Sequence, residues 1–197
     1  MKIYDRIRVN QWFLATIGVL MLALSCAGLF HAVRATWAAH WSRKAQCGPP
    51  TRDVEQVLEC CRRAFVLYRW NYYLSTFAAE WAYYKADEVG GDLKAERMRQ
   101  AELWCERGLM QNGYKSQLRR LKTRFLWERS PAEAIAYWES HTHWQYWEPY
   151  NHETLAELYA KYGELDKATC ELKLIENFPA YEATRAVVEN ERKFWTE

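Results

Sequence analysis

The residues of this chain with the clearest capacity for binding are aromatic and lie in one stretch, from Tyr137 to Tyr150. Its tryptophans are Trp138, Trp144 and Trp147. Flat indole rings offer a large contact area, so they can bind a partner peptide or stack on a sugar ring. Three interpretations of the stretch are open: rings that fill the space between two helical hairpins, a protein-binding surface, or an aromatic platform for a glycan.

Nothing in the sequence has the residue pattern of a catalytic centre. The motifs GxSxG and HExxH and the phosphate-binding P-loop are all absent. Glu153 and Glu157 could share acid–base work, but two carboxylates on an ordinary helix face are usually solvated. His141, His143 and His152 lack the spacing typical of zinc ligands, so we interpret them as solvated or capping residues. We therefore expect no enzyme activity, no cofactor and no metal.

The charge balance argues against nucleic acid as a partner. The formal net charge is +2, and the first 34 positions more than account for this excess. A near-neutral domain binds nucleic acid poorly, because contacts with phosphates dominate that affinity. The basic run from Arg119 to Arg124 is then either a solvated helix face or part of a protein-binding surface.

The sequence contains six cysteines: Cys26, Cys47, Cys60, Cys61, Cys105 and Cys170. None of them forms a CxxC pair. We interpret them as buried or unreactive thiols. A disulfide among the last five stays an alternative if the domain faces an oxidising compartment.

An apolar N-terminal segment precedes all of these residues. From Val9 to Val33 the sequence contains no Asp, Glu, Lys or Arg. As a helix, this run is long enough to cross a hydrocarbon layer of about 30 Å. We therefore predict a single transmembrane helix at residues 11–36, in contact with the lipid bilayer. A cleaved signal peptide is the main alternative, although its apolar region is usually shorter. A lipoprotein with Cys26 as its lipidated residue is a weaker alternative.

The orientation of this segment is predicted from its flanking charges. Three basic residues precede the apolar run and three follow it: Lys2, Arg6, Arg8, Arg34, Arg43 and Lys44. The positive-inside count is almost balanced. A short basic head before a first hydrophobic segment favours a cytoplasmic N-terminus, which places the C-terminal domain on the non-cytoplasmic side.

A Pro-Pro pair marks the boundary between this segment and the rest of the chain. We predict a short basic tail at residues 1–10, a juxtamembrane linker at 37–50 and one helical domain at 51–197. Thr51 is the predicted cap of the first helix of that domain.

Helical periodicity predicts paired helices in this domain. Between residues 151 and 179, apolar residues recur at spacings of three and four along two helices, which are separated by Gly163. They are Leu155, Ala156, Tyr159, Ala168, Leu172 and Ile175. The same face occurs 34 residues earlier, beginning at Leu118, and a further helix is predicted at 67–88. Ser130 and Pro131 have the residue types of a helix start.

With Leu155, Ala156, Tyr159, Gly163 and Ala168 on the family's consensus positions, the last hairpin resembles a tetratricopeptide repeat (TPR). At the level of repeats, the resemblance covers about residues 70–179. It departs from the family at two positions: Lys122 occupies a position that is normally Gly or Ala, and Arg129 replaces the glycine of the turn. The resemblance implies an all-α chain, in which the transmembrane helix precedes a short TPR-like α-solenoid of antiparallel helix pairs.

In TPR hairpins the first helix lines a concave groove that binds other proteins. The resemblance places Tyr83, Arg119, Trp127, Glu153 and Glu157 in this groove. It implies a membrane-anchored adaptor or scaffold, in a cell-envelope or membrane complex, whose partners are membrane or envelope proteins. The alternatives are a glycan-binding accessory protein of polysaccharide assembly or export, and a structural subunit of a larger membrane complex.

Overall fold

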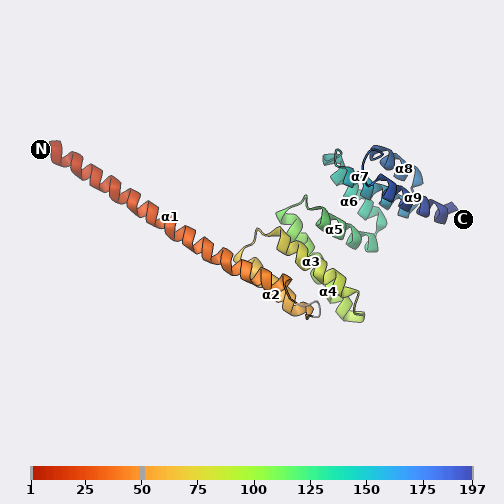
Figure 1. Cartoon of the computed structure of the whole chain (residues 1–197), viewed down its shortest axis with the longest axis horizontal. Helices are drawn as coiled ribbons and strands as arrows, with labels where there is room; N and C mark the ends of the chain where they lie inside the picture. Colours follow the sequence, from red (N-terminus) through yellow and green to blue (C-terminus); the bar gives the residue numbers. More distant parts are fainter. Residues whose placement is uncertain (1, 49–51, 197) are drawn as a thin grey trace. The chain divides into compact units, whose positions relative to one another are not determined.

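The computed structural model describes residues 2–48 and 52–196, and every regular element in these residues is a helix (Figure 1). The helices in these ranges are α1 (Lys2–Gln46), α2 (Val54–Leu67), α3 (Tyr72–Ala86), α4 (Gly91–Gln111), α5 (Ser116–Arg129), α6 (Pro131–Trp144), α7 (Pro149–Tyr162), α8 (Leu165–Leu174) and α9 (Tyr181–Thr196). The prediction of an all-α chain with one long apolar N-terminal helix is confirmed for the described residues. The chain divides into two compact units, Met1–Gly113 and Tyr114–Glu197, so the region predicted as one domain, 51–197, contains a unit boundary.

α1 has the length and composition of a membrane-spanning helix. Its 45 residues correspond to about 68 Å at 1.5 Å per residue, more than twice the thickness of a hydrocarbon layer of about 30 Å. The part from Gln11 to Gln46 is the one candidate span among the described residues, and no residue of its most apolar window is buried. α1 is therefore long enough and apolar enough to cross a bilayer.

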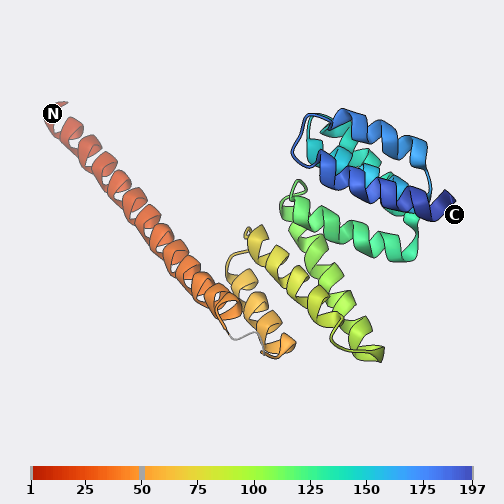
Figure 2. The ribbon, with the colours of Figure 1, turned by 45° about the vertical axis from the view of Figure 1, so that its right-hand side comes forward.

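The segment predicted as a linker, 37–50, is helical as far as Gln46. In this last part of α1, Ala38 and Ala45 are buried, and α1 packs there against α2 (Figure 2). Small side chains at a helix contact permit a close approach of the two axes. The apolar segment and the first packed helix pair therefore share one continuous helix.

α2 is an amphipathic helix with a defined start. The side chain of Asp53 accepts a hydrogen bond of 3.3 Å from the Glu55 N–H and caps the helix. The predicted cap, Thr51, and the Pro-Pro pair before it lie outside the described residues. The buried face of α2 consists of Val54, Val57, Leu58, Cys60, Cys61 and Ala64.

α3 and α4 form a closely packed hairpin in the same unit. Both helices contain small residues that are buried: Ala78, Ala79, Ala82, Ala86, Ala101 and Gly108. α3 is shorter than the predicted 67–88, because Asn71 caps it by accepting a hydrogen bond from the Leu74 N–H. The hairpin therefore begins with α3 immediately after the α2–α3 connection.

The second unit contains α5 to α9 around one apolar core. The core residues are Ile135, Trp138, Leu155, Ala156, Leu158, Tyr159, Ala160, Ala168, Leu172, Ile175 and Val188. They include all six residues of the stripe that helical spacing predicted in the last hairpin. The buried side of that hairpin is therefore the predicted one.

Two predicted boundaries in this unit are confirmed. Ser130 caps α6, since its Oγ accepts a hydrogen bond of 3.3 Å from the Glu133 N–H, and Pro131 follows as the first helical residue. Gly163 ends α7 with φ of +88°, a left-handed conformation that favours glycine. The Glu164 N–H then reaches back to the carbonyl oxygen of Tyr159 at 2.9 Å.

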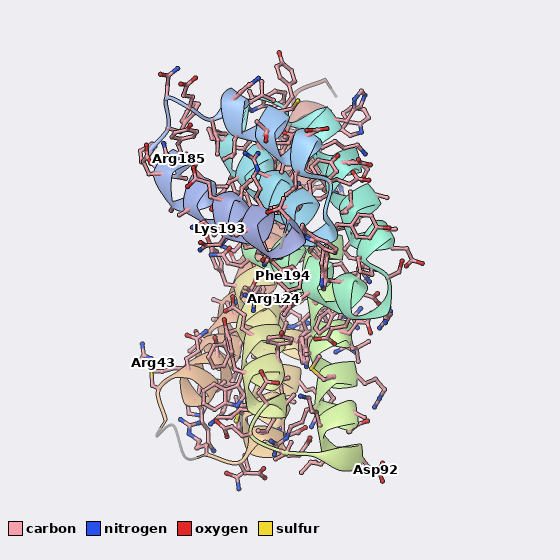
Figure 3. The ribbon with its side chains drawn as sticks, turned by 90° about the vertical axis from the view of Figure 1, so that its right-hand side faces the viewer. Arg43, Asp92, Arg124, Arg185, Lys193 and Phe194 are labelled. Atoms are coloured by element: carbon pink, nitrogen blue, oxygen red, sulfur yellow. The ribbon has the colours of Figure 1, made fainter. Side chains whose placement is uncertain are left out.

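α9 is the last helix of the described residues, and it packs against α7 and α8. Val188 and Thr184 are buried on its inner side, and the Trp195 indole N–H donates to the carbonyl oxygen of Ala160 at 3.1 Å. Arg185 and Lys193 lie on its exposed side (Figure 3). One face of this helix is therefore solvated.

Candidate interaction surfaces

α5 and α7 of the second unit bring opposite charges together. Arg120 Nη2 lies 3.3 Å from Glu153 Oε1, and the Arg120 guanidinium lies 4.3 Å from the centre of the Tyr150 ring. Burial raises the pKa of Tyr150 to about 12, so the phenol is neutral at physiological pH. The half-buried Glu157 follows one turn further along α7, and burial raises the pKa of its carboxyl. We call these four residues the α5–α7 surface.

The five residues predicted for the groove occupy three different environments. Arg119 is only 3% exposed, and its Nη1 donates a hydrogen bond of 3.0 Å to Gln145 Oε1. Trp127 is half-buried against the apolar core of its unit. Tyr83 is half-buried on α3, in the first unit. Only the two predicted glutamates belong to the α5–α7 surface.

The interior position of Arg119 has an electrostatic consequence. Burial lowers the pKa of its guanidinium, because desolvation penalises the charged form. The bond to Gln145 and the Tyr114 ring, 5.5 Å from the guanidinium carbon, partly replace the lost water. Arg119 therefore holds the turn between α6 and α7 rather than presenting its charge at the surface.

Arg120 and Tyr150 were not among the predicted groove residues. The sequence does contain a signal for their meeting, because Arg120 precedes Glu153 by nearly one 34-residue period. If the two hairpins are repeats, residues one period apart are expected to lie side by side. Arg119 lies 34 residues before Glu153, but Arg120, 33 residues before it, is the arginine that pairs with the Glu153 carboxylate.

The three tryptophans of the predicted aromatic platform are not equivalent. Trp138 has no exposed surface, and its indole N–H donates a hydrogen bond of 3.0 Å to the carbonyl oxygen of Asn151. Trp144, the last residue of α6, is 78% exposed, and Trp147, in the turn that follows, is 64% exposed. Trp138 therefore belongs to the core, and the exposed rings lie at the turn, which also contains Tyr146. We call residues 144–148 the aromatic turn.

Buried polar residues of α7 hold the aromatic turn. Asn151 Nδ2 donates a hydrogen bond of 2.9 Å to the carbonyl oxygen of Gln145. His152 Nε2 lies 2.5 Å from the carbonyl oxygen of Tyr146, and His152 Nδ1 lies 2.6 Å from Glu171 Oε2 on α8. These hydrogen bonds hold the backbone of the turn in place. The backbone of the turn therefore loses little conformational entropy when the exposed rings bind a ligand.

The interpretation of His152 as a solvated or capping residue is wrong. Its side chain is buried, because α7 places it between the aromatic turn and α8. His141 is half-buried, its Nδ1 lies 2.7 Å from the carbonyl oxygen of Tyr137, and burial lowers the pKa of its ring. His143 is exposed. The described residues contain no group of three or more His, Cys, Asp or Glu side chains that could hold a metal ion.

The first unit contains a cavity of about 380 Å³ between the end of α1, α2 and the start of α3. Its wall is mainly small and apolar, with a few polar side chains: Ala35, Ala38, Ala39, Ser42, Arg43, Gln46, Cys47, Ala64, Tyr68, Asn71 and Leu74. Ala35, at one end of the lining, directly follows Arg34, where charged residues reappear in α1. The cavity is therefore near the membrane boundary if α1 spans a bilayer.

All six cysteines are free in the described structure. Cys60, Cys61 and Cys105 are buried, whereas Cys26, Cys47 and Cys170 are exposed. Burial raises the pKa of the Cys61 thiol to about 12, which makes this thiol unreactive at neutral pH.

Comparison with known proteins finds no family model, no curated protein and no solved structure that matches this chain. The resemblance to TPR proteins therefore depends on the residue pattern of the hairpins alone.

Proposed function

We propose that this chain is a membrane-anchored helical adaptor, which uses a TPR-like helical region to bind another membrane or cell-envelope protein. The observation that carries the proposal is the continuity of α1. Its exposed apolar part passes, without an intervening linker, into the part that buries Ala38 and Ala45 against α2. A span that is joined to its domain in this way fixes the domain close to the bilayer.

This attachment has a consequence for binding. A protein that is confined to a membrane meets membrane partners at a raised effective concentration, so a weak contact surface suffices. The α5–α7 surface fits such a contact. Glu157 is half-buried with a raised pKa, and a cationic side chain of a partner would stabilise its charged form. Arg120 and Glu153 supply a charge pair that sets the register of the partner segment.

Site-specific photocrosslinking in intact membranes tests the adaptor proposal. A photoreactive amino acid at Glu157 should give a discrete crosslinked protein. The matched control is the exposed Lys173 on α8, at which we expect no such product. Arg120→Glu should remove the product from position 157 while the helical circular dichroism stays unchanged. Equal products at both positions, or persistence of the product in Arg120→Glu, would exclude the α5–α7 surface.

A second candidate function is glycan binding, and the aromatic turn favours it. Trp144 and Trp147 are exposed on a turn that is bonded to Asn151 and His152, and rigid exposed rings suit stacking on sugars. Titration with cell-envelope oligosaccharides should quench tryptophan fluorescence in the full chain and not in Trp144→Ala/Trp147→Ala. No quenching in the full chain would end this candidate.

The proposed sidedness has the N-terminus in the cytoplasm and the helical region on the other side. Protease added to the non-cytoplasmic face of sealed membranes should then digest the C-terminal region. Protection until the membranes are lysed would reverse the assignment.

A structural subunit of a larger complex would co-purify with its complex in mild detergent through α1. This co-purification would not depend on the residue at position 120.

A further inference from the structure

The connection between α2 and α3 lies level with the end of the apolar run of α1. Arg34 is the first charged residue after Val33, and its Nη2 donates a hydrogen bond of 3.3 Å to the carbonyl oxygen of Val66. Figures 1 and 2 both show this connection beside α1, on the side from which the N-terminal part of α1 arrives. We call residues 66–73 the α2–α3 corner.

The level of Arg34 relative to a bilayer follows from helix geometry. The run from Val9 to Val33 is about 38 Å long, whereas the hydrocarbon layer is about 30 Å thick. If the run is centred, Arg34 lies about 4 Å beyond the hydrocarbon, within the headgroup region. The hydrogen bond from Arg34 to Val66 places the α2–α3 corner at a similar depth.

The corner presents large apolar and aromatic side chains to the outside. Trp70 is 76% exposed, and Val66, Tyr68 and Tyr73 are exposed as well. The Gln111 side-chain amide of α4 donates a hydrogen bond to the carbonyl oxygen of Arg69, which brings the exposed Met110 to the same end of the unit. Trp and Tyr are enriched where proteins meet the interface of a membrane.

The charge of the α2–α3 corner also suits a membrane surface. No Asp or Glu occurs between Glu59 and Glu80, so Arg69 is the one ionised side chain of the corner at neutral pH. At the opposite end of the α3–α4 hairpin, acidic and basic side chains are paired: Lys94 Nζ lies 3.2 Å from Asp87 Oδ1, and Lys85 pairs with Glu88. Asp92 is exposed at the same end (Figure 3). A basic and aromatic end without carboxylates suits lipid headgroups better than an end where carboxylates and amines are paired.

We propose that the α2–α3 corner is a second membrane contact, with its aromatic rings in the headgroup region and Arg69 on lipid phosphates. This inference rests on the proposed span of α1, and it deepens the adaptor proposal because two attachment points fix the orientation of the first unit. The Tyr and Trp rings contribute amphipathic contact area, and Arg34 and Arg69 supply the charge that attracts anionic lipid. The bilayer is the favoured occupant because the corner is continuous with the lipid-exposed side of α1.

Photocrosslinking to lipid tests this contact in the full chain, reconstituted in vesicles of phosphatidylcholine and phosphatidylglycerol. A photoreactive amino acid is placed at Trp70 or Tyr73, and lipid adducts are measured by mass spectrometry. Leu93 is the matched control, because it is an exposed apolar residue at the opposite end of the α3–α4 hairpin. Leu22, within the apolar run, reports the span itself.

The expected result is lipid adducts at positions 22, 70 and 73 and none at 93. The double variant Arg69→Glu/Trp70→Glu should reduce the adducts at position 73 severalfold, with unchanged circular dichroism. Adducts at 22 without adducts at 70 and 73 would overturn the corner contact while the span stands. Absence of adducts at 22 would refute the span. A protein product at position 70 in native membranes, without lipid adducts, would mean that a protein partner occupies the corner, and this also overturns the proposal.

Discussion

Replacing Trp138 by Phe tests whether this residue belongs to the core or to a binding platform. Trp138 has no exposed surface, and its indole N–H donates to the carbonyl oxygen of Asn151 at 3.0 Å. Phenylalanine fills most of the space but cannot donate this bond. The loss of such a buried hydrogen bond costs about 0.5–1.5 kcal/mol. The lost ring volume adds a cavity penalty, so we expect a destabilisation of about 2–4 kcal/mol.

The matched control is Trp144→Phe, which makes the same chemical change at a residue that is 78% exposed. Substitutions at exposed sites usually change stability by no more than about 0.5 kcal/mol. A contrast between the two variants then isolates burial and the indole bond, because the side-chain chemistry is identical. If Trp138 were part of a surface platform, the two variants would have similar effects on stability.

Amide hydrogen exchange in the full chain, in detergent micelles, is the appropriate assay. It reports local opening and does not require the two units to unfold together. A loss of 2–4 kcal/mol corresponds to exchange that is roughly thirtyfold to several hundredfold faster in α6 and α7. Unchanged exchange in Trp138→Phe, or equal acceleration by Trp144→Phe, would refute the assignment of Trp138 to the core.

Three further predictions concern the second unit. His152→Ala removes both contacts of the imidazole, so exchange should accelerate in the aromatic turn and around Glu171, by about thirtyfold for a loss of about 2 kcal/mol. Exchange that matches the unsubstituted chain would contradict this. Gly163→Ala forces a left-handed φ of +88° on alanine and brings its Cβ to 3.3 Å from the Trp195 ring. We expect a loss of about 1–2 kcal/mol, measured as a lower melting temperature, and an unchanged midpoint would disprove the strain. Glu157→Gln should raise the melting temperature at pH 7 and leave it unchanged near pH 4. The raised pKa of this carboxyl means that its protonated form is favoured in the folded chain, and stability is lost as pH rises from 4.5 through the folded value; an equal shift at both pH values would contradict the assignment.

The sequence identified helices well where local signals were strong. Gly163 and Ser130 are residue types that end and begin helices, and both do so in the structure. The core role of Trp138 was also visible, because Trp138 precedes the core residue Leu172 by 34 positions. The aromatic composition of its surroundings left two further interpretations open, a protein-binding surface and a glycan platform. Periodicity was the better guide, since it reflects which face of a helix is buried.

Other features depend on contacts that a sequence pattern does not contain. The burial of Arg119 follows from its bond to Gln145, which comes from a turn 26 residues away. The aromatic turn is likewise held by His152 through Glu171 of the next helix. Such contacts are set by how neighbouring helices are packed, and neither residue type nor spacing fixes them. For this reason the sequence predicted the helices more reliably than the exposed residues of the groove.

Because α1 is continuous, residues 37–46 belong to a packed helix and not to a linker. The Pro-Pro pair favoured a linker from residue 37, yet the buried Ala38 and Ala45 mark a face that packs closely against α2. No proline interrupts the helix from Lys2 to Gln46, so no kink of the usual kind separates the apolar run from this face. The tilt of the span therefore sets the orientation of α2. Because the α2–α3 corner follows at the end of α2, its contact with headgroups would in turn restrict that tilt, and the two membrane contacts would stabilise each other.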